Sequence, residues 1–219
     1  MISKHKYDLH KYPFAGLISE LFNGVDLQHI ERYEDVTYNF FSEPGKDSDT
    51  VYHQLFYNKM RSGWDDLVVT YRSFVRDIIA PIMGENERLI YQKWPTFRVQ
   101  LKDNVAVGGW HRDLDYNHPI GETNFVIAIT PMFESNTIIS ELTPGKMDFR
   151  QMDMNPGEFT RFNGNQCIHG NLPNKTGVSR VSIDFRVLRP KDYNPNHSPA
   201  SLSKGHRFLI GDYYEELFL

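Results

Sequence analysis

The sequence predicts an α+β fold that is mainly β: a double-sheet jelly roll with helices contributed by the N-terminal part. Helical periodicity of apolar residues is confined to the first 95 residues, and short strand-like runs separated by turn formers fill the stretch after Trp94. A chain of 219 residues is long enough for one well-buried core. We therefore expect a single domain over residues 1–219, with a helical portion at 1–95, a β core at 96–190 and a C-terminal extension at 191–219.

Two segments of the N-terminal portion have apolar residues at helical spacing, Phe14 to Phe22 and Trp64 to Met83. In the longer segment, Ser62 is placed to cap the start, and Pro81 with Gly84 marks the end. One face of this helix is expected to pack against a sheet. The intervening stretch 42–49 is rich in turn formers and charge, so it is read as a surface loop that either connects elements or serves as a lid.

Five strands are expected in the β core, with shorter ones around Trp110 and Cys167. Many brief strands at this spacing favour a jelly roll whose open end holds a ligand. The segment 208–219 is expected to return to cover the core or to form a subunit contact. The five main strands are predicted at Phe97–Leu101, Asn124–Thr130, Thr137–Glu141, Glu158–Phe162 and Arg180–Leu188.

Composition excludes several classes of protein. The net charge of −4 and pI near 6.1 provide no general attraction to nucleic acid or to an anionic membrane. The single cysteine, Cys167, cannot form an intramolecular disulfide, and the N-terminus lacks the apolar run of a signal peptide. We therefore expect a cytoplasmic protein that acts on a small molecule and binds neither nucleic acid nor membrane.

The stretch His111-Arg112-Asp113, together with His169 much later in the chain, predicts a metal site. Residues i and i+2 of a strand point the same way, so His111 and Asp113 can converge on one ion. Two imidazoles and one carboxylate on one face of a ferrous ion leave three positions open, an arrangement typical of non-heme iron oxygenases. His111, Asp113 and His169 are thus the candidate iron ligands and catalytic residues.

Other residues compete for this role. Asp115 is a second carboxylate near His111, but its spacing is less natural. His29-Ile30-Glu31 has a similar form, yet it lies in an expected helix, where residues i and i+2 diverge. Cys167 is a soft potential ligand, although a free cysteine more often packs as a small hydrophobic residue.

A candidate site for a dicarboxylate co-substrate follows His169. In the strand from Ser179 to Arg186, polar and apolar residues alternate, so Arg180, Ser182, Asp184 and Arg186 share one face. A guanidinium can grip a carboxylate through two parallel hydrogen bonds, and a serine hydroxyl can add a donor. We assign Arg180 and Ser182 to the distal carboxylate of 2-oxoglutarate, whose keto acid end would chelate the iron.

Other polar residues are candidates for the same cavity, although alternation alone does not show which strand face is inward. Asn171 and Asn174 suit either a turn or a hydrogen bond to the second ring nitrogen of a ligating histidine. We assign Gln100, Asn124 and Thr137 to the surroundings of the co-substrate, and Arg98, Glu141 and Arg186 to the prime substrate.

The segment from Phe97 to Arg189 resembles the superfamily of iron- and 2-oxoglutarate-dependent oxygenases, whose motif is His-x-Asp, a distant His and then Arg-x-Ser. Its amino-acid sequence looks most like that of the streptomycin-biosynthesis protein G group in five short segments: Trp110–Asp113, 121–125, 135–137, 169–171 and 179–187. The resemblance covers a little under half of the chain. It implies a double-stranded β-helix of cupin-like form, iron bound by His111, Asp113 and His169, and 2-oxoglutarate bound by Arg180 and Ser182.

The resemblance also bears on the reaction. Related halogenases replace the carboxylate ligand with a small residue to admit chloride, so the presence of Asp113 favours hydroxylation or another oxidation over halogenation. The expected cofactor is Fe(II), with 2-oxoglutarate and O2 as co-substrates and with succinate and CO2 as products. The alternative is a cupin-like protein that holds a metal or a sugar, or acts as an isomerase, without turning over 2-oxoglutarate.

Overall fold

Two antiparallel sheets and a helical layer make up the protein, as seen in a computed structural model that describes residues 2–33, 50–104, 109–202 and 205–219. The chain is mainly β with few helices, as predicted. The strands are β1 Ser3–Lys6, β2 Arg88–Gln92, β3 Thr96–Gln100, β4 Thr123–Ala128, β5 Ile138–Glu141, β6 Phe149–Gln151, β7 Glu158–Phe162, β8 His169–Asn171, β9 Arg180–Leu188 and β10 Tyr214–Phe218. The helices are α1 Phe14–Leu21, α2 Val51–Ser62, α3 Asp65–Phe74 and α4 Ala80–Met83, with a π-helical turn at Val75–Ile79.

The large sheet has seven strands in the order β1-β7-β4-β9-β2-β10, and β3 also pairs with β9. The long strand β9 is paired with β4 along one edge, and with β3 and then β2 along the other. This arrangement corrects the expectation that residues 1–95 are purely helical, because β1 and β2 lie there. The C-terminal segment returns to the sheet, where β10 pairs with β2.

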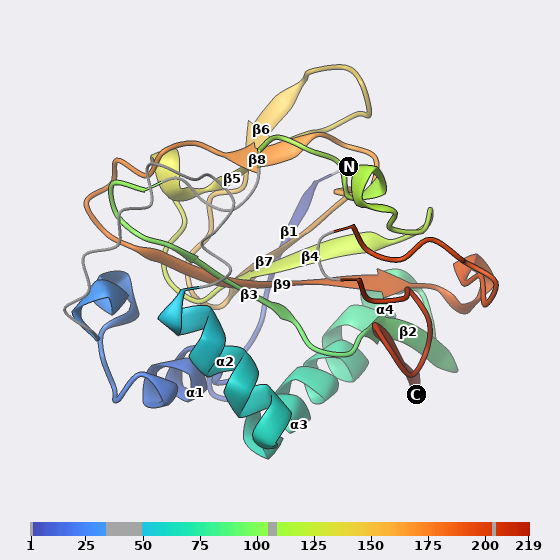
Figure 1. Cartoon of the computed structure of the whole chain (residues 1–219), viewed down its shortest axis with the longest axis horizontal. Helices are drawn as coiled ribbons and strands as arrows, with labels where there is room; N and C mark the ends of the chain where they lie inside the picture. The colour runs from blue at the N-terminus through green and yellow to red at the C-terminus, as the bar shows by residue number, and fades with distance from the viewer. Residues whose placement is uncertain (1, 34–49, 105–108, 203–204) are drawn as a thin grey trace.

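The helices cover one face of the large sheet (Figure 1). On β9, Val181, Ile183, Phe185 and Val187 are fully buried in the hydrophobic core that includes the helices. Because side chains alternate along a strand, Arg180, Ser182, Asp184 and Arg186 face the other way. The sequence left this direction open; the helical layer settles it.

The small sheet, in the order β6-β5-β8, lies on the side of the large sheet away from the helices (Figure 1). A smaller apolar cluster that includes Val126, Met152 and Phe162 packs with Ile138 of β5. The polar side of β9 therefore faces the space between the two sheets.

Both predicted helices are present, with one corrected boundary. The longer one runs from Asp65 to Met83 through the π-helical turn, and it passes Pro81 before Gly84, in a left-handed conformation (φ 74°), ends it. Ser62 does not cap it: Ser62 is the last residue of α2, and Trp64 occupies the position before α3. The π turn widens the helix just ahead of Pro81, which lacks a backbone N–H.

The five main strands are confirmed, and β7 and β9 have the predicted bounds. In place of strands around Trp110 and Cys167, the structure has a single bridge between His111 and His169, and β8 begins at His169. Helix α2 was not predicted, although Tyr52, Phe56 and Met60 bury one side of it at intervals of four residues. The segment 42–49, considered as a lid, lies outside the described residues. Among the described helices, none has the length and apolar character needed to cross a bilayer.

Candidate metal and co-substrate site

A two-way backbone pairing brings His111 and His169 together. The His111 N–H donates to the His169 carbonyl at 3.1 Å, and the His169 N–H donates to the His111 carbonyl at 2.9 Å. Directly paired residues of antiparallel strands place their side chains on the same face. The two imidazole rings accordingly lie with their centroids 4.5 Å apart.

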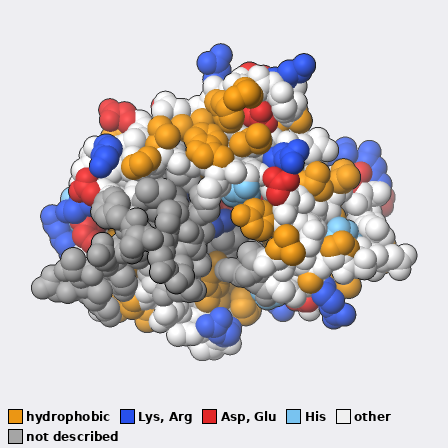
Figure 2. Space-filling model, turned by 45° about the horizontal axis from the view of Figure 1, so that its top comes forward, with side chains coloured by type: hydrophobic (Ala, Val, Ile, Leu, Met, Phe, Trp, Pro, Cys, Tyr) orange, Lys and Arg blue, Asp and Glu red, His pale blue; other side chains and the backbone are white. Residues whose placement is uncertain are grey.

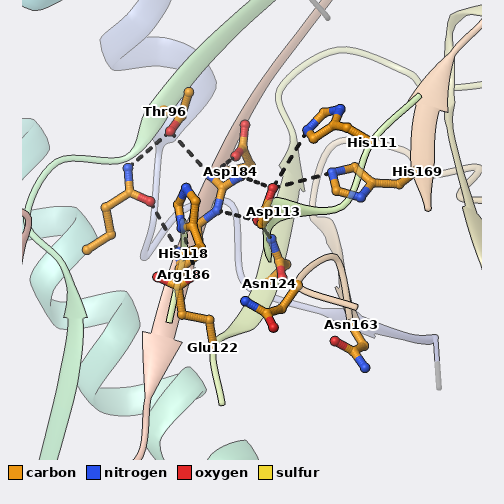
Figure 3. A network of polar contacts seen from close by, with 12 residues as sticks. Thr96, His111, Asp113, His118, Glu122, Asn124, Asn163, His169, Asp184 and Arg186 are labelled. Carbon is orange, nitrogen blue, oxygen red and sulfur yellow. Dashed lines mark hydrogen bonds and ion pairs between the residues drawn. The ribbon is translucent and has the colours of Figure 1, made fainter. Parts of the chain in front are cut away.

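Asp113 joins these rings two residues after His111. Arg112 is extended (φ −108°, ψ 146°), which turns Asp113 to the side of His111, and a 3-10 helix begins at Asp113 itself. Asp113 Oδ1 lies 3.7 Å from Nε2 of both His111 and His169 (Figure 3). Ligand atoms of the three residues all lie within 4.8 Å of one another, so one ion can contact all three.

Each imidazole has the tautomer that metal binding requires. Nδ1 of His111 lies 2.8 Å from the Gly109 carbonyl, and Nδ1 of His169 lies 3.1 Å from the Cys167 carbonyl. A carbonyl can only accept, so each Nδ1 carries a hydrogen and each Nε2 keeps its lone pair. Burial lowers the pKa of His169, and this effect outweighs the charge of Asp113, which acts in the opposite direction. The lowered pKa keeps the ring neutral and able to bind a metal.

Asp113 is almost fully buried, with 3% of its side chain exposed. Asn124 Nδ2 donates to Oδ2 at 2.6 Å, and Arg186 donates from Nε to Oδ2 at 3.0 Å and from Nη2 to Oδ1 at 3.3 Å (Figure 3). Burial alone would raise the pKa of Asp113, but the positive charge of Arg186 and its hydrogen bonds to the carboxylate hold that pKa well below the ordinary range. The residue is therefore a carboxylate at neutral pH.

Arg186 is part of a buried charge network. Its Nη1 donates to Asp184, and Arg98 Nε donates to the same carboxylate at 2.8 Å. The pKa of Asp184 is lowered because these two guanidinium groups outweigh the effect of burial. Arg98 is the most exposed of the three, with 31% of its side chain accessible.

Arg180 lies in the same cleft, 2% exposed. Its Nη1 donates to Ser182 Oγ at 2.8 Å and its Nη2 donates to Gln100 Oε1 at 3.2 Å. Gln100 is the direct register partner of Arg180 in the β3–β9 pair, which explains the contact. The cleft between the sheets is lined by His111, His169, Arg180, Arg98, Asp184 and Arg186, together with the apolar side chains Ile138 and Phe162.

The outer surface next to this cleft carries hydrophobic side chains over the small sheet. Figure 2 shows them beside a hollow, at whose edge a histidine side chain reaches the surface. The triad is thus deep enough to be shielded by protein yet open at one side, because 24% of the His111 side chain is exposed while that of His169 is only 10% exposed.

Five of the predicted pocket residues are outside the set that lines the cleft: Gln100, Asn124, Thr137, Glu141 and Ser182. Glu141 accepts hydrogen bonds from the backbone N–H groups of Gly145, Met147 and Ile168, so it organises the β5–β6 turn and the approach to β8. The buried Thr137 hydroxyl contacts the Ile138 carbonyl. Asn124, assigned to the co-substrate, contacts Asp113 instead.

Several alternatives are resolved by position. Asp115 pairs with Arg112 at 2.7 Å on the surface, and Glu31 accepts a hydrogen bond from Ser179. Neither carboxylate belongs to the described groups whose ligand atoms could share one ion. Cys167 is fully buried and contributes its carbonyl to His169. The histidine partners are thus backbone carbonyls rather than Asn171 or Asn174.

Asn171 and Asn174 have different roles. Asn171 lines the cleft and donates to the Thr137 carbonyl at 2.8 Å. The side chain of Asn174 donates to the carbonyls of Gln100, Leu101 and Val178, which makes it a turn former.

Two features of the site were missed from the sequence. His118 Nδ1 contacts Glu122 at 2.7 Å, and both lie beside Asp113, within the 4.8 Å that would permit a shared ion. The contacts of Asn124 and Arg186 with Asp113 were also missed. Asn124 and Arg186 are direct register partners in the β4–β9 pair, and the sequence carries no signal that specifies this register.

Comparison with known proteins identifies the family. No family model matches the chain. The streptomycin biosynthesis protein StrG from Streptomyces griseus is 33% identical to it over 210 residues, which cover 96% of each protein. The chain belongs to the StrG family. The likeness to the streptomycin-biosynthesis protein G group, predicted from the motifs, is confirmed and extends over nearly the whole length.

The solved structures that resemble this chain are less similar to it in sequence than StrG is. EctD from S. alaskensis, solved with 2-oxoglutarate and 5-hydroxyectoine, gives a TM-score of 0.49 at 9% identity, covering 88% of this chain and 72% of EctD. AviO1 from Streptomyces viridochromogenes Tue57 gives 0.46 at 14% identity, covering 88% and 91% of the two chains. Because these TM-scores and identities are low, the chemistry of this chain has to be argued from its own residues.

Proposed function

We propose that the protein is an Fe(II)- and 2-oxoglutarate-dependent dioxygenase that hydroxylates a C–H bond of a polar small molecule, with release of succinate and CO2. One observation carries the proposal: the two histidines of the triad and the buried Arg180 line a single cleft between two antiparallel sheets. We further propose that these sheets form the double-stranded β-helix of cupin-like proteins.

The triad suits ferrous iron by its donor set. Two neutral imidazole nitrogens and one carboxylate oxygen from His111, His169 and Asp113 form the facial arrangement that non-heme iron enzymes use. The fixed tautomers direct both Nε2 lone pairs toward the same point as Asp113 Oδ1. Iron bound here would supply the oxidative chemistry, with O2 and a keto acid in the three remaining positions.

Arg180 suits the distal carboxylate of 2-oxoglutarate. A guanidinium is always charged and presents its donors in a planar fork that matches a carboxylate. Ser182 and Gln100 accept hydrogen bonds from two different nitrogens of Arg180 and thereby fix the plane of the group. The keto acid would then span the cleft from Arg180 to the triad.

The remaining walls orient the substrate and limit water. Ile138 and Phe162 make part of the lining apolar, while Arg98 and Asp184 present a charged pair to the same space. This mixture suits a polar organic substrate better than an apolar one. The name of StrG places that relative in streptomycin biosynthesis, which supports a small-molecule substrate for this chain as well.

Turnover of 2-oxoglutarate tests the proposal. Fe(II)-loaded protein, supplied with 2-oxoglutarate and O2, is expected to release CO2 and form succinate slowly when no substrate is present. A metabolite that is a substrate should accelerate succinate formation, and mass spectrometry should show that this metabolite has gained one oxygen atom. The variant His169→Ala is expected to form no succinate. A protein that binds metal tightly but never decarboxylates 2-oxoglutarate, with any metabolite tested, would instead be a cupin-like binding protein or isomerase.

A further inference from the structure

We propose that Arg186 and Asn124 are positioning residues that hold Asp113 as a one-oxygen metal ligand. The inference rests on the proposed function, and it gives these residues roles different from the substrate and co-substrate contacts expected from the sequence. Its starting observation is that the two oxygens of Asp113 have different surroundings. Oδ1 lies 3.7 Å from each Nε2 of the triad and accepts one longer hydrogen bond, from Arg186 Nη2 at 3.3 Å, whereas Oδ2 accepts two shorter ones, from Asn124 at 2.6 Å and from Arg186 Nε at 3.0 Å.

The two donors reach Asp113 because the sheet places them side by side. Asn124 on β4 and Arg186 on β9 are register partners, and cross-strand neighbours on one face lie close together. Their neighbours Phe125 and Phe185 pack in the core with the helices, so Asn124 and Arg186 face the other side of the sheet, where Figure 3 shows them beside Asp113. The large sheet, rather than a flexible loop, therefore sets the orientation of the ligand.

The orientation of the Asn124 amide supports this role. Its Nδ2 lies 2.6 Å from Asp113 Oδ2, while its Oδ1 is buried with no partner among the described residues. The reverse orientation would place two acceptor oxygens against each other. Leaving a buried carbonyl oxygen unbonded is unfavourable, so the contact with the carboxylate decides the orientation.

Gly164 gives Asn124 the room to make this contact. A methyl group added at Gly164 would lie 2.8 Å from Asn124 Nδ2, 2.9 Å from its Cγ and 2.8 Å from Cε2 of Phe162, closer than a methyl group approaches such atoms in proteins. The Gly164 carbonyl also accepts from the Asp113 N–H at 2.9 Å. One residue thus fixes the backbone of Asp113 and admits the side chain that holds its carboxylate.

Arg186 is itself held in place from the cleft side. Its Nη1 donates to Asp184, which also accepts from Arg98. Three different nitrogens of the guanidinium contact two carboxylates, so the fork cannot turn without breaking several charge-assisted hydrogen bonds. Asn124 and Arg186 use both lone pairs of Oδ2, so for Oδ2 to bind the metal too it would have to give up one of these hydrogen bonds.

The consequence concerns the open positions on the metal. Three single ligand atoms leave three positions, enough for a keto acid that binds through two atoms and for O2. A carboxylate that bound through both oxygens would take one of these positions. Asn124 and Arg186 keep this position available. They also hold the carboxylate in its binding orientation beforehand, so that less conformational entropy is lost when the metal binds.

Co(II) binding tests the role, because this ion reports its coordination by its visible d–d absorption. Asn124→Ala removes one donor to Oδ2, and we expect its Co(II) affinity to fall about 10- to 100-fold, with a changed d–d spectrum at saturation. Asn58→Ala is the control for the same change of residue, since Asn58 is exposed on α2, outside the cleft, where its Oδ1 accepts from Arg61. It should bind Co(II) as the wild type does.

A second pair of variants leaves both donors intact. Gly164→Ala is expected to displace Asn124 and to weaken Co(II) binding in the same direction. Gly16→Ala is its control, because a methyl group at Gly16 meets nothing within 4 Å. Arg186→Lys keeps the charge but loses the fork, and it should alter the d–d spectrum, whereas Arg189→Lys, which changes a partly exposed pair with Asp192 outside the cleft, should leave it unchanged.

The outcomes separate the two proposals. If the wild type binds no Co(II), the proposed function is wrong. If the wild type binds Co(II), and the folded Asn124→Ala and Gly164→Ala variants bind it with the same affinity and spectrum, the function stands and the positioning role is overturned. A loss of thermal stability without any change in the spectrum would assign these residues a structural role only. If Arg186→Lys fails to fold, the Asn124 and Gly164 variants decide the question.

Discussion

Replacement of Arg180 by lysine isolates the contribution of its fork to co-substrate binding. Lysine keeps the positive charge but has one nitrogen, so it cannot bond both oxygens of a carboxylate while also meeting Ser182 and Gln100, as the guanidinium does at 2.8 and 3.2 Å. Loss of one charge-assisted hydrogen bond costs about 1.5–3 kcal/mol, which corresponds to a rise in the dissociation constant of about 10- to 150-fold. Binding of the metal itself should be unchanged.

The assay is an anaerobic titration of 2-oxoglutarate into Fe(II)-loaded protein, followed by the charge-transfer absorption of the chelate. Arg150→Lys, an exposed position on β6, makes the same chemical change away from the cleft and is expected to match the wild type. Equal affinity for 2-oxoglutarate in the Arg180→Lys variant and the wild type would refute the assignment of Arg180. A loss of Fe(II) binding in that variant would refute it as well, because it would show that the substitution disturbs the triad.

Three further predictions concern the cleft and its charge network. Removing Nε2 in His111→Ala should abolish succinate formation; any residual turnover above that of free iron would contradict its role as a ligand. Asp184→Asn weakens a buried network, and we expect a loss of about 3 kcal/mol, seen as a fall of about 6–12 °C in melting temperature, whereas Asp192→Asn at a surface pair should cost less than about 1 kcal/mol. Equal melting of the two would refute the difference. Because the pKa of Asp184 is lowered in the folded protein, its stabilising contribution is present above the ordinary aspartate pKa of about 4 and is lost as the pH falls through the lower folded value. Urea unfolding should therefore show the gap between wild type and Asp184→Asn narrowing below about pH 4; a constant gap would contradict the linkage.

The parts of the fold that the sequence predicts well are those with a strong local pattern. β9 has the predicted bounds because polar and apolar residues alternate from Arg180 to Val187, and β7 has them because turn formers at 155–157 and 163–165 enclose it. The strands β1, β2 and β10 were missed, since each is short and gains its stability from a distant partner, such as β10 from β2. Helix α2 was missed because polar residues dilute the few apolar positions that it buries.

The candidate site shows the same division. The cluster of His111, Asp113 and His169 was predicted because the spacing of His111 and Asp113 is local and His169 lies eleven residues before Arg180, as in the Arg-x-Ser motif. The contacts of Asn124 and Arg186 with Asp113 depend on strand register, which a single sequence does not specify. Likewise, the inward face of β9 became known only from the helices that cover the opposite face.

An anomalous-difference map recorded at the iron absorption edge tests the central claim most directly. In crystals grown without oxygen in the presence of Fe(II) and 2-oxoglutarate, we expect one peak within bonding distance of Nε2 of His111, Nε2 of His169 and Oδ1 of Asp113, with Arg180 against the far carboxylate of the keto acid. A map with no peak between these three atoms, or with the iron bound elsewhere in the protein, would contradict it.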